Sequence, residues 1–119
     1  MLRKFFFRPW GWWIAIYEGS DYLVKVIHIN KGQQLSLQKH EHRDETWTIA
    51  EGKGEIFCDN FWQMARKGKM VTIKKGTPHR AKAADESLVI IEVQHGDVLS
   101  EDDIIRIEDD YGRVQENLE

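Results

Sequence analysis

"LSLQKHEHRDETW", residues 35–47, places Gln38, His40 and His42 at alternate positions and then adds Glu45. In a β-strand, side chains two residues apart lie on the same face, so a strand here would gather one amide and two imidazoles. A carboxylate follows directly after them in the chain. Such a face is either a solvated polar surface or part of a metal site.

Around this stretch, short runs of β-branched and aromatic residues alternate with Gly, Asn and Asp turns. Strands at this spacing predict an all-β sandwich or barrel rather than βαβ units. Only "SEDDII" (residues 100–105) predicts a helix, with Ser100 as its N-cap, and residues 113–119 are predicted to fray. The strand-like runs are "WWIAIYEG", "YLVKVIHI", "LSLQKHEH", "TWTIA", "GEIFCD", "FWQMA", "MVTIKKG" and "SLVIIEVQ".

The composition restricts the classes of protein to which the chain can belong. Its 119 residues fit one domain, and 41% hydrophobic with 31% charged residues is typical of a globular protein. The net charge of -3 gives no general attraction to nucleic acid, and no stretch has the length of a membrane span. The one cysteine, Cys58, excludes an internal disulfide framework and favours a reducing cytoplasm. No base motif lies beside Cys58, so we assign it no catalytic role.

A metal site needs a ligand from another part of the chain, and "KKGTPHRA" (residues 74–81) provides His79 after a Gly-Thr-Pro turn. In a small barrel, a His on one strand can meet ligands from another strand across the interior. Imidazole nitrogens with carboxylate or amide oxygens suit Zn, Mn, Fe(II), Co or Ni. We therefore expect one divalent ion, with zinc as the first choice. A single His more often serves structure, so this hypothesis depends on the combination.

Residues 32–52, "GQQLSLQKHEHRDETWTIAEG", resemble the first cupin motif, G-x5-H-x-H-x3-4-E-x6-G, and residues 68–79, "GKMVTIKKGTPH", resemble the second. More narrowly, the chain resembles the C-terminal cupin domain of type II mannose-6-phosphate isomerases. The segments that carry this resemblance are "RPWGWW", "LSLQKHEHRDETW", "GTPHRA", "IIEVQHG" and "EDDIIRIEDDYGR".

The resemblance implies a single cupin domain over residues 1–119, a double-stranded β-helix or jelly-roll barrel with an N-terminal aromatic strand at about residues 1–13. In that family the domain is often fused behind a nucleotidyltransferase domain that makes GDP-mannose. This sequence contains only the cupin part, so pyrophosphorylase activity is not among our expectations.

The motif can be aligned in two registers. In the first, Gln38 replaces the first motif His, and the intervals to His40, Glu45 and the following Gly all fit. This set with His79 also resembles the zinc ligands of type I phosphomannose isomerases. In the second, His40 and His42 form the pair, and Glu45 comes one residue too early. We favour the first register, in which His42 contacts a metal ligand or the substrate.

Two positions depart from the family pattern. The family usually has His where this chain has Thr46, and cupins usually carry Pro at the position of Lys74. If the family's extra His binds the metal, Thr46 weakens or abolishes the site.

The resemblance implies interconversion of mannose 6-phosphate and fructose 6-phosphate through an enediol. This reaction needs a base, stabilisation of the developing enediolate oxygens and a hold on the phosphate. In "IIEVQ", Glu92 and Gln94 share one strand face; if that face lines the barrel, Glu92 is the candidate base and Gln94 binds substrate, and otherwise Glu92 is an exposed edge carboxylate. Arg113, in the family's tail signature, or Arg80 is the candidate for the phosphate.

Six aromatic residues crowd the start of the chain, where core packing or a dimer contact is the expected role. Cupins commonly pair through such edge strands, so we expect a homodimer. Two other classes remain open: a non-enzymatic sugar-binding or regulatory cupin, and a metal-independent nucleotide-sugar isomerase that uses the His residues as acids and bases. The aromatic residues are Phe5, Phe6, Phe7, Trp10, Trp12 and Trp13.

Overall fold

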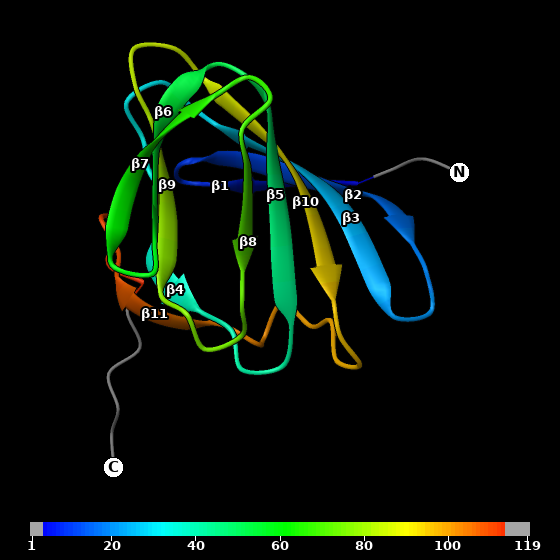
Figure 1. Cartoon of the computed structure of the whole chain (residues 1–119). Helices are drawn as coiled ribbons and strands as arrows, with labels where there is room; N and C mark the ends of the chain where they lie inside the picture. The colour runs from blue at the N-terminus through cyan, green and yellow to red at the C-terminus, as the bar shows by residue number, and fades with distance from the viewer. Residues whose placement is uncertain (1–3, 114–119) are drawn as a thin grey trace.

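The computed structural model describes residues 4–113, which form two antiparallel sheets that face each other (Figure 1). The six-stranded sheet has the order β1-β2-β3-β10-β5-β8 and the five-stranded sheet the order β11-β4-β9-β6-β7. This arrangement confirms the predicted all-β class. The strands are β1 (Phe5–Arg8), β2 (Gly11–Glu18), β3 (Tyr22–Ile29), β4 (Leu37–Lys39), β5 (Asp44–Glu51), β6 (Lys53–Cys58), β7 (Phe61–Arg66), β8 (Met70–Ile73), β9 (His79–Ala83), β10 (Leu88–His95) and β11 (Ile105–Glu108).

The core lies between the two sheets, and the period-2 alternation of the strands builds it. In β5, for example, Trp47 and Ile49 are buried while Thr46 and Thr48 are half-buried on the other face. Ile56 of β6 and Ile90 of β10 are fully enclosed in the same cluster. Burial of such side chains contributes about 1.5–3 kcal/mol each and provides the main driving force for closing the barrel.

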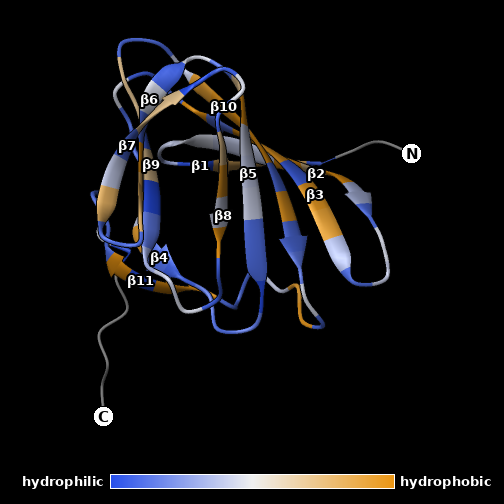
Figure 2. Ribbon diagram, viewed as in Figure 1, coloured by the Kyte–Doolittle hydropathy of each residue, from blue (hydrophilic) through white to orange (hydrophobic). Residues whose placement is uncertain are grey.

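The inward face changes from apolar to polar along three neighbouring strands. Toward one end of the barrel, β3 continues its inward face from Ile27 to Lys25, and β10 continues from Ile90 to Glu92. The register pairs Glu92 with Lys25 on one side and with Trp47 on the other. Figure 2 shows the same end as hydrophilic in β4 and in the first half of β5. The fold therefore places charged side chains inside the barrel at this end.

The N-terminal aromatic residues divide between core and surface. Trp10 and Trp13 are buried, whereas Phe5 and Phe7 of β1 are 48% and 73% exposed. The predicted aromatic strand thus corresponds to a hairpin of β1 and β2, and residues 1–3 lie outside the described part.

The predicted helix at residues 100–105 is wrong. Ser100 caps only a turn, in which its hydroxyl accepts from the Asp102 amide at 3.0 Å and its carbonyl from the Asp103 amide at 3.1 Å. The chain then enters β11, which pairs with β4. The Asp103 carboxylate accepts from the amides of Glu41 and His42, so the turn is tied to the neighbouring loop instead of continuing as a helix. Of the predicted frayed tail, residues 114–119 lie outside the described part.

Within residues 4–113, no helix has the length and apolar character that crossing a membrane requires.

Candidate functional site

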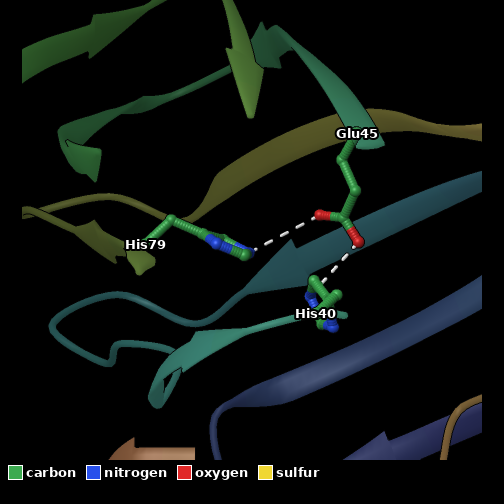
Figure 3. A group of neighbouring side chains, drawn as sticks. All are labelled: His40, Glu45 and His79. Carbon is green, nitrogen blue, oxygen red and sulfur yellow. Dashed lines mark ion pairs between the residues drawn. The ribbon is translucent and has the colours of Figure 1, made fainter. Parts of the chain in front are cut away.

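Three buried side chains meet at the polar end of the barrel. His40 follows β4, Glu45 lies in β5 and His79 begins β9, and one ligand atom from each lies within 4.8 Å of the others. The His40 Nε2 is 3.3 Å from one Glu45 oxygen, and the His79 Nε2 is 3.6 Å from the other (Figure 3). We call these three residues the His-Glu-His cluster.

Backbone carbonyls fix how each imidazole presents its nitrogens. The Nδ1 of His40 lies 2.6 Å from the Asp103 carbonyl, and the Nδ1 of His79 lies 2.9 Å from the Thr77 carbonyl. A carbonyl only accepts, so each Nδ1 carries the proton and donates it. Each Nε2 therefore directs a lone pair toward Glu45, which is the arrangement that metal-binding His residues use.

Burial keeps both imidazoles neutral. The pKa of His79 falls from 6.5 to about 4, because burial disfavours the charged form and His40 lies beside it. The pKa of His40 is also lowered, first by burial and then by the Arg43 charge. Both rings are therefore free bases near neutral pH and can donate lone pairs.

The donor set of the cluster fits a small divalent metal. The His79 Nε2 and the Glu45 Oε1 are buried without a hydrogen-bond partner among residues 4–113, which is a costly arrangement unless another group satisfies them. Tetrahedral zinc with bonds of about 2.0–2.1 Å would separate its ligand atoms by about 3.3 Å. One ligand atom from each residue of the cluster already lies within 4.8 Å of the others. The residues present are thus suited to hold the ion.

Gln38 shares the inward face with the cluster, whereas His42 does not. Gln38 of β4 pairs directly with His79 of β9, and its side chain lines the same cavity. His42 is exposed, because β4 ends at Lys39 and the chain bends before β5. The predicted strand over residues 35–42 is therefore too long, and the structure does not bring His42 to the His-Glu-His cluster.

Arg43 enters the cavity, although the sequence analysis did not single it out. Its Nε donates to Glu45 at 2.8 Å, its Nη1 donates to the Ser100 carbonyl at 2.9 Å, and its Nη2 lies 3.4 Å from the His40 Nε2. The side chain is buried, at 5% exposed. The same bend that turns His42 outward brings Arg43 inward, and no spacing rule for a regular strand predicts this reversal.

Thr46 lies outside the cavity. It alternates with Glu45 in β5 and is paired with Val93 and Thr72 in the adjacent strands. A side chain at this position points away from Glu45, so a His there would not reach the cluster. Lys74 follows β8 in an exposed turn, where its carbonyl accepts from the Thr77 amide at 3.1 Å.

Glu92 and Gln94 face the interior. Glu92 lines the cavity, and its two oxygens accept from the Trp47 indole at 2.9 Å and from the Gln94 amide at 2.8 Å. Its pKa is raised, first by burial and then by the neighbouring Glu45 charge. Gln94 is fully buried, and its amide donates to Glu92 and so orients that carboxylate.

The two candidate phosphate-binding arginines lie in different surroundings. Arg113 lines the cavity, and Asp109 holds its guanidinium through two bonds of 2.8 and 2.9 Å. Arg80 follows His79 in β9 and so points to the opposite face, where its Nε donates to the Leu35 carbonyl. The structure therefore does not bring Arg80 to the cavity that the other predicted site residues line.

Lys25 is a second cavity residue that the sequence analysis missed. It is 3% exposed, its ammonium lies 3.8 Å from the centre of the Trp13 ring, and it is paired with Glu101. A signal was present, because Lys25 stands in the alternating set that includes Ile27 and Ile29. A lysine on an otherwise apolar strand face indicates a polar interior at that level.

Comparison with known proteins finds a matching family model and relatives that are similar in sequence. The family model described as "Mannose-6-phosphate isomerase C-terminal" matches residues 2–109. The alginate biosynthesis protein AlgA of Pseudomonas aeruginosa is 40% identical over 111 residues, which cover 92% of this chain and 23% of AlgA. The mannose-1-phosphate guanylyltransferase of Escherichia coli is 36% identical over 91% of this chain and 23% of that protein. The chain thus spans about a quarter of the length of these relatives.

Solved structures support the same fold. The capsular polysaccharide assembling protein CapF of Staphylococcus aureus superimposes with a TM-score of 0.80 at 18% identity, over 91% of this chain and 35% of CapF. A Klebsiella pneumoniae protein with a double-stranded β-helix domain has a TM-score of 0.69 at 22% identity, over 81% of this chain and 83% of that one. These likenesses confirm the predicted cupin barrel.

Proposed function

Since the chain belongs to the family of mannose-6-phosphate isomerase C-terminal domains, we propose that it is a metal-dependent isomerase that interconverts mannose 6-phosphate and fructose 6-phosphate. The observation that carries this proposal is the convergence of two neutral imidazoles on a buried carboxylate inside the barrel. Glu92 lies in the same cavity as an additional carboxylate, and the reaction needs such a base.

The residues that would hold the metal are His40, Glu45 and His79, with Gln38 as the fourth. Two observations support Gln38 as this ligand: it is paired with His79, and its side chain lines the cavity. Zinc is the first choice for this donor set, and Mn, Co, Ni or Fe are the alternatives. When bound, the ion would polarise the carbonyl and stabilise negative charge on the sugar oxygens.

Glu92 is the residue that we assign to proton transfer. An aldose-ketose isomerisation removes the proton from C2 and returns one to C1, so one carboxylate can act first as base and then as acid. The pKa of Glu92 is raised toward neutral pH, which suits a group that both removes and returns a proton. Hydrogen bonds from Trp47 and Gln94 fix the direction of its carboxylate. Arg43 would hold Glu45 in place.

A non-enzymatic sugar-binding cupin is the second candidate. The position of Arg43 favours this second candidate, because its guanidinium lies 2.8 Å from Glu45 and already neutralises the carboxylate that would bind the metal. The isomerase requires that the metal and Arg43 share Glu45, whose second oxygen has no hydrogen-bond partner among residues 4–113. We propose the cytoplasm as the compartment in either case, since Cys58 is a free, buried thiol.

Turnover in deuterated water tests the proposed reaction. Metal-loaded protein should convert mannose 6-phosphate to fructose 6-phosphate and incorporate solvent deuterium at C1, because the transferred proton exchanges on the base. Glu92→Gln should reduce kcat by at least about 100-fold, the lower range for a general base, with metal content unchanged. Sugar phosphate that binds without any turnover would favour the sugar-binding cupin.

A further inference from the structure

A row of side chains leads from the His-Glu-His cluster to the edge of the five-stranded sheet. His79 of β9 is paired with Gln38 of β4, and Gln38 is paired with Arg106 of β11. Directly paired residues share a face, so all three point to the same side of the sheet. Two strand spacings place the Arg106 backbone roughly 10 Å from that of His79.

Arg106 is one of three arginines that line this part of the cavity. The others are Arg8, at the end of β1, and Arg113, which follows β11. Burial lowers the pKa of Arg106, and the positive charges of Arg113 and Arg8 lower it further. Arg106 therefore lies close enough to Arg113 and Arg8 to be repelled by both, with Asp109 and Glu101 as the opposing negative charges.

The charges of this group are only partly compensated. The Arg106 Nε is buried without a partner among residues 4–113, and the hydrogen bond that Arg8 makes goes to the Phe7 carbonyl. Arg113 is different, because Asp109 holds it in a fixed direction. The three side chains are half-buried, so like charges with open donors repel one another there, and an anion bound between them would relieve that repulsion.

We propose that Arg8, Arg106 and Arg113 form the subsite that binds a phosphate monoester dianion. Guanidinium groups suit this ligand because their planar donors bind phosphate oxygens in pairs. Lys25 lies nearby but is already paired with Glu101, so it is not part of this subsite.

The position of the subsite also matches the shape of a hexose 6-phosphate. Its reacting carbons, C1 and C2, lie at one end of the sugar and its phosphate at the other. With the phosphate at Arg106, the sugar extends along the row toward Gln38 and His79. In this form the inference rests on the proposed function, although binding of a phosphate monoester does not require turnover.

Calorimetry with inorganic phosphate and with glucitol 6-phosphate, which has no carbonyl to isomerise, tests the subsite directly. Arg106→Gln should weaken binding of both by about 10- to 100-fold, the loss expected for a charge-assisted hydrogen bond. The matched control is Arg66→Gln on β7, an exposed arginine outside the cavity, and it should bind both as the wild type does. Arg8→Gln provides a second variant, and circular dichroism verifies that each is folded.

The outcomes separate this inference from the proposed function. Phosphate binding that Arg106→Gln or Arg8→Gln weakens by about 10-fold or more, in a protein without turnover, supports the subsite and contradicts the isomerase. Turnover with KM for mannose 6-phosphate unchanged in both variants contradicts the subsite and leaves the isomerase standing. A wild-type protein that binds neither phosphate probe also overturns the subsite. A rise in KM larger than the fall in kcat supports both.

Discussion

Each imidazole of the His-Glu-His cluster depends on a backbone carbonyl that fixes its orientation. His40 and His79 present Nε2 because backbone carbonyls hold their Nδ1 protons. Gln38 has no comparable support, since its amide nitrogen makes one long contact of 3.4 Å with the Ser36 carbonyl. The side chain of Gln38 is therefore free to turn its oxygen toward the cluster.

Removal of Gln38 and of His42 should have unequal effects on metal affinity. Gln38→Ala removes a proposed ligand and should weaken zinc binding by more than about 10-fold, whereas His42→Ala changes an exposed side chain and should leave it unchanged. Zinc titration against a competing chelator measures both. His40→Ala and His79→Ala should fail to bind. If His42→Ala empties the site while Gln38→Ala keeps it full, the second register is correct.

The metal-free protein should lose stability between about pH 6.5 and pH 4. In this window the unfolded imidazole of His79 takes up a proton, while the folded one, with its pKa at about 4, does not. The free energy of unfolding therefore falls as the pH falls, by up to about 3 kcal/mol from this group.

Urea denaturation of the wild type and of His79→Gln at several pH values isolates that contribution. Glu92, whose raised pKa acts in the opposite direction, is present in both proteins. The stability difference between them should change across this window. A difference that stays constant from pH 7 to pH 4 would contradict a buried, neutral His79.

Resemblance to the cupin motif predicted that His40, Glu45 and His79 meet, and it left open whether Gln38 or His42 joins them. Gln38, His40 and Glu45 match the sequence intervals of the first motif, and His79 matches the last position of the second motif. Arg43 and His42 exchange faces because the chain bends between β4 and β5. Such a bend depends on the Asp103 carboxylate, more than 60 residues away in the chain.

At the scale of strands, alternation explains why Thr46 is compatible with a metal site. Its neighbour Glu45 points inward, so Thr46 must point outward.

Most strands could be predicted from runs of β-branched and aromatic residues. Strand β11 could not, because the acidic residues after Ser100 resemble the start of a helix. Pairing of β11 with β4, a tertiary contact, overrides that local preference.

Restoring the family's usual residue provides a test of this alternation. Thr46→His should leave zinc affinity within about twofold of the wild type, because the new imidazole lies on the outer face, beyond the reach of a metal ligand. Zinc titration measures the effect, with His40→Ala as the control for a lost ligand. Tighter zinc binding by Thr46→His would show that position 46 reaches the cluster.

At the scale of the whole molecule, we expect a homodimer that forms through the first strand. β1 ends the six-stranded sheet, so its outer backbone groups are available, and Phe5 and Phe7 are exposed on it. Light scattering should give a mass equal to two chains for the wild type. For Phe7→Lys the measured mass should fall toward that of one chain. Phe61→Lys, on the exposed strand β7, is the control. A wild-type mass of one chain would contradict the expectation.

The proposed isomerisation depends on a metal ion in the His-Glu-His cluster. The most direct measurement is the metal content of the purified protein, determined together with mannose 6-phosphate turnover before chelation, after chelation and after zinc is returned. We predict about one ion per chain, loss of turnover on removal and recovery on return. Protein that binds no Zn, Mn, Co, Ni or Fe, or that turns over equally well without metal, would contradict the central claim.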